Sequence, residues 1–249
     1  MPLVAFVLGA LFGSFANVLI HRLPRGESVI WPGSRCPSCG HRLRWWENVP
    51  LVSFMVLRGR CAACSAPISW RYPLVELLMA LIFTYAAGRH GLSWNGLSTA
   101  ALGMLLVPVF FIDLEHRIVP DRITLPGMAL GLGFSFARGG VGGLVEALLA
   151  GVAAGGVLML VALASHGGMG GGDIKLAAML GSFLGWPRVA VGLFVGVLVG
   201  GLVALGLLLA GRKGRKDFIP FGPALALGGF VGMEWGNQLL HAYLRAFGL

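Results

Sequence analysis

Long apolar runs dominate the chain and alternate with short polar or glycine-rich stretches. The clearest runs cover residues 3–20, 94–112, 143–164 and 189–210. At a helical rise of about 1.5 Å per residue, each run is long enough to cross a hydrocarbon core of roughly 30 Å. The pattern therefore predicts transmembrane helices.

Shorter apolar runs complete a set of eight predicted crossings. They cover residues 3–20, 73–88, 94–112, 123–137, 143–165, 174–186, 188–211 and 222–243. The first is interpreted as a retained span, because no basic region precedes it and no small-residue cleavage site follows it. The sixth is short, so we expect it to be tilted or only partly inserted. Glycine spacings such as Gly151 with Gly155, and Gly192 with Gly196 and Gly200, favour close helix packing.

The composition agrees with a membrane protein and assigns a topology. The 249 residues are 57% hydrophobic and 12% charged, with a net charge of +9. Eight of the 19 Lys and Arg residues lie between residues 22 and 71, and four more lie between 212 and 216. Placing both clusters in the cytoplasm, with both termini outside, satisfies the positive-inside rule. The charge then indicates membrane orientation and contact with anionic lipid of the bilayer, not nucleic-acid binding.

These patterns predict an all-α polytopic membrane protein of about eight transmembrane helices with a small cytoplasmic insert. We divide it into a first transmembrane helix (1–20), a cytoplasmic insert (21–72) and a transmembrane core (73–249). The predicted location is a membrane, with the functional face toward the cytoplasm.

The insert carries the four cysteines of the chain as two CxxC pairs. They are Cys36 and Cys39 in "CPSC", and Cys61 and Cys64 in "CAAC". Two such pairs favour a closed, structural Zn²⁺ site of the zinc-ribbon type. Reduced metal-free thiols are one alternative, and disulfides or a redox role are another, although a cytoplasmic loop disfavours disulfides.

Two aspartates are predicted at the same cytoplasmic depth. Asp113 ends the third span, and Asp173 follows the glycines 170–172 at the start of the sixth. Two carboxylates in a low-dielectric site tend to share one proton, so one can activate water while the other acts as an acid. This arrangement is typical of aspartic proteolysis. Two alternatives stay open: Asp173 as a helix N-cap, and a proton or ion pathway.

The residues around this aspartate pair suggest supporting roles. Without Cβ atoms, Gly170, Gly171 and Gly172 are expected to adopt unusual backbone angles and to let an extended substrate lie against the loop. Lys175 is expected to pair an acidic group of a substrate or, more simply, a lipid phosphate. Asp121, in "VPD", is a rival for the first catalytic position and is treated as supporting.

The chain also resembles the prepilin peptidases, the polytopic aspartic proteases of type IV pilus and type II secretion systems. The matching pieces, in order, are "GSFANVLIHRLP" (13–24), "SRCPSCG" (34–40), "NVPLVSFMVLRGRC" (48–61), "RYPLVE" (71–76), "IDLEHRIVPDRITLP" (112–126), "GMGGGDIKLAAMLG" (168–181) and "IPFGPALALGG" (219–229). The resemblance implies a location in the bacterial inner membrane, and cleavage of the short basic leader of prepilins and pseudopilins on the cytoplasmic side, immediately after a glycine. By motif, it makes Asp113 and Asp173 catalytic.

Family members with the cysteine insert generally also methylate the new amino terminus with S-adenosylmethionine. The resemblance therefore implies a bifunctional enzyme, but no glycine-rich nucleotide-binding motif locates the methyl donor in this sequence. Two other functions stay open from the residues alone, a non-catalytic zinc-ribbon assembly factor and a proton-coupled transporter. The sequence does not indicate an oligomeric state.

Overall fold

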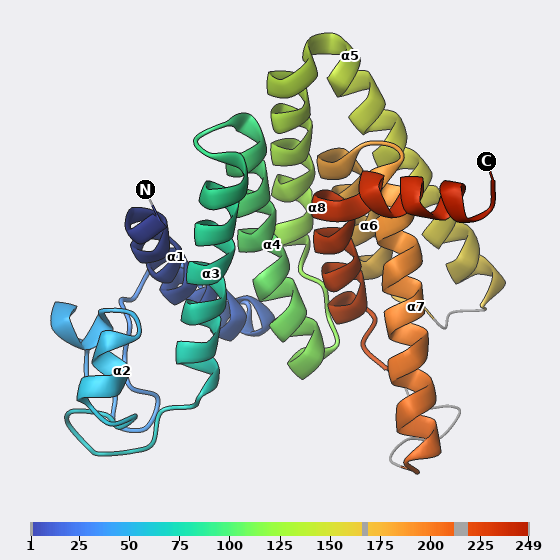
Figure 1. Cartoon of the computed structure of the whole chain (residues 1–249). Helices are drawn as coiled ribbons and strands as arrows, with labels where there is room; N and C mark the ends of the chain where they lie inside the picture. Colours follow the sequence, from blue (N-terminus) through green and yellow to red (C-terminus); the bar gives the residue numbers. More distant parts are fainter. Residues whose placement is uncertain (1, 166–168, 212–218, 249) are drawn as a thin grey trace. The chain divides into compact units, whose positions relative to one another are not determined.

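The computed structural model describes residues 2–165, 169–211 and 219–248, and these ranges are predominantly helical (Figure 1). The helices are α1 (Pro2–Arg22), η1 (Leu23–Arg25), η2 (Trp45–Asn48), α2 (Val52–Val56), α3 (Arg71–His90), α4 (Trp94–His116), α5 (Asp121–Ala164), α6 (Gly171–Leu184), α7 (Arg188–Leu209) and α8 (Gly222–Ala246). The described residues form no strand, only two isolated bridges inside the insert. The all-helical prediction is confirmed. Gly168 and the basic residues Arg212, Lys213, Arg215 and Lys216 lie outside the described residues.

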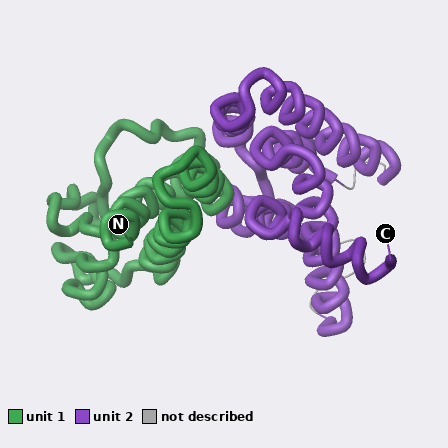
Figure 2. Tube along the Cα trace, turned by 45° about the horizontal axis from the view of Figure 1, so that its top comes forward, with its two compact units in different colours: residues 1–108 green, residues 109–249 purple. Residues whose placement is uncertain are grey.

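The chain divides into two compact units, residues 1–108 and residues 109–249 (Figure 2). Unit 1 contains α1, the insert, α3 and most of α4. Unit 2 contains the last turns of α4 and helices α5 to α8. The boundary lies at Pro108 inside α4, so the predicted 73–249 core is divided between the units.

The helices follow the predicted apolar runs. Within the described residues, four helical segments are long and apolar enough to cross a membrane: Pro2–Arg25, Trp94–His116, Asp121–Ala164 and Arg188–Leu209. Helices α3, α6 and α8 occupy three further predicted spans but do not meet the same criteria of length and apolarity. The count of eight crossings stays a prediction.

Helix α5 is a bent helix that accounts for two predicted spans. Its 44 residues would extend well beyond a bilayer at helical rise if they were straight. Gly140 breaks it with φ 59° and ψ −145°, a conformation that favours glycine. Helix α5 bends over between its two halves (Figure 1). Gly143 then passes so close to the Ser135 carbonyl that a Cβ atom would overlap it.

Close packing at glycine holds the helix pairs of each unit together. In unit 1, a Cβ on Gly13 of α1 would lie 2.6 Å from the Glu76 Cα of α3. In unit 2, a Cβ on Gly192 of α7 would lie 3.0 Å from the Gly228 carbonyl of α8. The small-residue spacing therefore marks helix contacts, as predicted.

The insert is built from two similar turns, one around each CxxC pair. The backbone N–H of Gly40 donates to the Cys36 carbonyl at 2.9 Å, and the N–H of Ser65 donates to the Cys61 carbonyl at 2.9 Å. Gly40 has φ 72° and Ser65 has φ 57°, so serine adopts the left-handed conformation that glycine adopts in the first turn. The second turn therefore keeps the same conformation although a serine follows Cys64 where a glycine follows Cys39.

Candidate active site and metal centre

Asp113 lies buried in the last turn of α4. It follows a run of buried apolar residues that ends at Ile112, and it is itself only 4% exposed. Its Oδ2 atom accepts a hydrogen bond of 2.8 Å from the backbone N–H of Gly222, the first residue of α8. The fold therefore holds one buried backbone donor against the Asp113 carboxylate, and this donor stabilises negative charge there.

Gly222 is a site residue that the residue patterns alone did not single out. A Cβ atom there would lie 2.7 Å from Asp113 Oδ2 and 3.0 Å from Asp113 Cγ. Only glycine therefore allows the α8 backbone to reach the carboxylate. The sequence signal for Gly222 is that it lies in the segment "IPFGPALALGG" (219–229), which contributes to the family resemblance. This segment has no titratable side chain that would suggest a role in the site.

Asp173 is the third residue of α6 and is 6% exposed. Helix α6 packs against α5, α7 and α8 within unit 2, and Asp173 is the buried residue of its first turn. The N-cap is Gly170, so the alternative in which Asp173 caps the helix is wrong. Asp113 lies near enough for its charge to act on Asp173. The structure thus brings together two buried carboxylates that lie 60 residues apart in the sequence.

The glycines before Asp173 do not have the backbone angles that were expected of them, and their contact with a substrate stays a prediction. None of Gly170, Gly171 and Gly172 has a positive φ, and Gly170 is extended with φ −76° and ψ 145°. The expectation of unusual backbone angles is therefore wrong for these residues. Gly172 is instead required by packing, because a Cβ there would lie 2.8 Å from Val119 Cβ. A Cβ on Gly171 would meet no neighbouring atom within 4 Å, so this position leaves space in front of the helix.

Asp121 and Lys175 pair with each other. The Lys175 Nζ atom lies 2.7 Å from both carboxylate oxygens of Asp121, and both side chains are about half exposed. Asp121 is the first residue of α5 and is about half exposed, whereas Asp113, the other candidate for the first catalytic position, is buried. The ion pair links the starts of α5 and α6, and it gives Lys175 a partner within the chain.

The four cysteine sulfurs form one cluster in unit 1. The Sγ atoms of Cys36, Cys39, Cys61 and Cys64 lie within 4.8 Å of one another, and all four thiols are free. The Cys36 and Cys64 sulfurs are 3.9 Å apart, far longer than a disulfide bond. Two sulfurs at about 2.3 Å from one tetrahedral ion would lie roughly 3.8 Å apart, so the cluster fits a metal ion.

Electrostatic effects are resolved at the cysteines and at Glu47 of the same insert. The backbone N–H of Cys39 lowers the pKa of Cys36 and favours its thiolate form, whereas the neighbouring cysteine side chains raise the pKa of Cys64. Glu47 is buried and accepts hydrogen bonds from the Arg44 backbone N–H at 2.7 Å and from His41 Nε2 at 3.0 Å. The bond from Arg44 lowers the pKa of Glu47, so this carboxylate is ionised at neutral pH.

Comparison with known proteins places the chain in a family. A family model described as the bacterial peptidase A24 N-terminal domain matches residues 7–90, and one described as the type IV leader peptidase family matches residues 99–205. A prepilin leader peptidase/N-methyltransferase of Stutzerimonas stutzeri is 38% identical over 98% of this chain and 93% of its own length. The chain belongs to the type IV leader peptidase family.

Other relatives in this family carry the same name. The Aeromonas hydrophila protein is 38% identical over 98% of this chain and 94% of its own length. The Myxococcus xanthus protein is 43% identical over 85% of this chain and 64% of its own length. No solved structure matches the chain significantly. Membership in the leader peptidase family confirms the resemblance found in the sequence.

Proposed function

We propose that this protein removes the leader peptide of type IV prepilins and pseudopilins and then N-methylates the new amino terminus. The names of the relatives, which cover nearly the whole chain, support both activities. The observation that carries the peptidase activity is the pair of buried carboxylates, Asp113 and Asp173, which come from separate helices of unit 2 and interact electrostatically.

The two aspartates would divide acid and base work between them. Asp113 is proposed as the ionised member, because the Gly222 N–H stabilises negative charge on its Oδ2 atom. It would remove a proton from water as the water attacks the scissile carbonyl. Asp173, protonated, would polarise that carbonyl and then protonate the leaving amine. We propose that this occurs after a glycine of the leader, at the cytoplasmic face of the inner membrane.

The four cysteines would hold a structural zinc ion. Their sulfur spacing supports this role, and four thiolates complete the coordination shell without an open position for water. Zinc would then stabilise the insert and would take no part in peptide cleavage. S-adenosylmethionine is proposed as the methyl donor, as the methyltransferase name of the relatives suggests.

The two other functions are not favoured. The relatives named as enzymes match this chain over nearly its full length, which argues against an assembly factor without activity. A proton-coupled transporter would need acids at mid-membrane depth. Asp113 and Asp173 lie instead at the end of α4 and the start of α6.

Separate Asp113→Asn and Asp173→Asn variants test the peptidase mechanism. Each is expected to lower leader cleavage of a prepilin in detergent by about 10²–10⁴-fold, because each removes a general acid or base. Glu115→Gln, an exposed substitution two residues from Asp113, serves as the matched control and should cleave normally. Full activity in both aspartate variants, or loss in Asp121→Asn alone, would overturn the assignment.

A further inference from the structure

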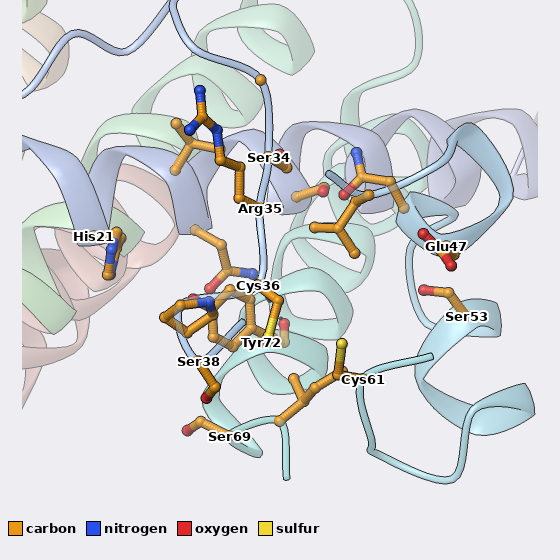
Figure 3. Close-up of a pocket in the computed structure, with 18 of the residues that line it drawn as sticks. His21, Ser34, Arg35, Cys36, Ser38, Glu47, Ser53, Cys61, Ser69 and Tyr72 are labelled. Carbon is orange, nitrogen blue, oxygen red and sulfur yellow. Dashed lines mark hydrogen bonds between the residues drawn. The ribbon is translucent and has the colours of Figure 1, made fainter. Parts of the chain in front are cut away.

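Unit 1 contains a cavity that is lined by neither Asp113 nor Asp173. Its volume is about 870 Å³, within the range of about 300–1,000 Å³ typical of sites for small molecules and cofactors. Its walls come from the second half of α1, the insert and the start of α3. Figure 3 shows His21 of α1, Cys36 and Glu47 of the insert and Tyr72 of α3 around this space.

Partly buried polar contacts join the walls of this cavity. Asn17 Nδ2 of α1 donates to the Tyr72 carbonyl of α3 at 3.0 Å. The Leu51 N–H of the insert donates to Glu76 Oε2 of α3 at 2.8 Å. Arg22 of α1 donates to the Pro32 carbonyl of the insert at 2.6 Å. The cavity is thus shaped before a ligand arrives, which lowers the ordering cost of binding.

Asn17 supplies an unused acceptor in this wall. The side chain is 3% exposed, and its Oδ1 atom has no hydrogen-bond partner among the described residues. A buried acceptor without a partner costs about 1–3 kcal/mol. A ligand that donates a hydrogen bond to Asn17 Oδ1 would remove this cost.

The other lining groups define the chemistry of the ligand. The lining residues include three acidic ones, Glu27, Glu47 and Glu76, and four arginines, Arg22, Arg25, Arg35 and Arg71. Trp31 and Tyr72 add aromatic surface. This set suits a zwitterionic molecule with an aromatic ring and several hydrogen-bond donors.

We propose that this cavity is the binding site for S-adenosylmethionine, and that Asn17 Oδ1 accepts a hydrogen bond from it. The inference rests on the proposed methyl transfer. The ligand carries an ammonium group, hydroxyl donors and a sulfonium charge that match the carboxylates, a carboxylate that matches the arginines, and an adenine ring that matches the aromatic surface. The residues present therefore fit the group.

A metal ion held by the cysteines would help to shape this cavity. Cys36 and Cys61 are among the residues that line it, so the turns that would hold the metal form part of the wall. When bound, the donor supplies a methyl group: the amine nitrogen forms the new C–N bond, the C–S electron pair stays on sulfur, and the amine proton leaves to water. Glu47 and Asn17 bind the donor; they are not assigned to the proton transfer.

Equilibrium dialysis of radiolabelled S-adenosylmethionine against the purified, metal-loaded full chain in detergent tests the site. We expect Asn17→Leu and Glu47→Gln each to raise the Kd by at least about tenfold, which corresponds to roughly 1.4 kcal/mol. Asn237→Leu, the same substitution on an exposed position of α8, should leave the Kd unchanged. Leader cleavage is measured on every variant as an independent activity.

Photolabelling of the unaltered protein with the same labelled donor covers the case in which a variant fails to fold. Label in peptides from residues 14–76 is expected. Label confined to residues 109–249, or an unchanged Kd in both Asn17→Leu and Glu47→Gln, would overturn the site while methyl transfer stands. A chain that cleaves leaders but neither binds the donor nor methylates would overturn the site together with the methyltransferase half of the proposed function.

Discussion

At the scale of single residues, Gly222 determines how the Asp113 carboxylate is oriented in the candidate active site. Gly222 holds Asp113 with a backbone N–H and leaves no room for a side chain. A backbone donor at the first residue of a helix is fixed by the helix itself, so the carboxylate is oriented without a flexible partner. The site therefore depends on a residue that has no functional group of its own.

Substituting Gly222→Ala tests this dependence. The added Cβ would meet Asp113 Oδ2 at 2.7 Å, so the carboxylate or α8 must shift. We expect leader cleavage to fall by about 10²-fold, the effect of misplacing a catalytic group by about 1 Å. Gly206→Ala in α7, where no atom lies within 4 Å of the added Cβ, should keep wild-type activity. Normal cleavage by Gly222→Ala would show that Asp113 does not need this close contact.

At the scale of elements, the start of α6 determines where the second aspartate lies. Helix α6 is surrounded by α5, α7 and α8, and its first turn is tied to α5 by the Asp121–Lys175 ion pair. Gly172 lets this turn approach Val119. The ion pair and the close packing together position Asp173 from outside the buried site.

A charge swap separates this positioning role from substrate or lipid binding by Lys175. Lys175→Glu places two like charges together and is expected to lower the free energy of unfolding by about 0.2–1 kcal/mol, the range for exposed pairs. The double variant Asp121→Lys with Lys175→Glu should recover stability and leader cleavage. Thermal unfolding and the cleavage assay measure both. A double variant as impaired as the single one would indicate that Lys175 binds an acidic substrate group or lipid phosphate.

At the scale of the whole molecule, the chain keeps two separate cores. The insert of unit 1 has few buried apolar residues, whereas α5 to α8 bury an extensive apolar core in unit 2. Segments that cannot bury enough apolar surface depend on a metal for their fold. The insert and the helices α5 to α8 therefore differ in what stabilises them.

Metal removal should reveal this difference. A chelator applied to the full chain is expected to make residues 21–72 sensitive to protease while residues 109–249 stay protected, because only the insert loses its cross-link. Cys61→Ser should produce the same pattern without chelator. Mass spectrometry of the fragments identifies the cleaved segments. Equal sensitivity of both regions, or no change in either, would contradict a structural metal in the insert.

The sequence by itself determined the features that depend on local chemistry. Apolar runs predicted the helices, because crossing a bilayer requires a continuous apolar segment, and the two CxxC pairs predicted the sulfur cluster, because each pair bends around one point. The two aspartates were found because carboxylates are rare in such a chain and lay at predicted helix ends. Their catalytic role stays a prediction.

Only the tertiary structure decided the contacts between distant residues. The Gly222–Asp113 hydrogen bond joins residues 109 positions apart, and the Asp121–Lys175 pair joins residues 54 positions apart. The cavity at Asn17 likewise needs α1, the insert and α3 together. No local pattern encodes these contacts, because they arise from how glycine-lined helices pack and from which polar atoms that packing leaves facing one another.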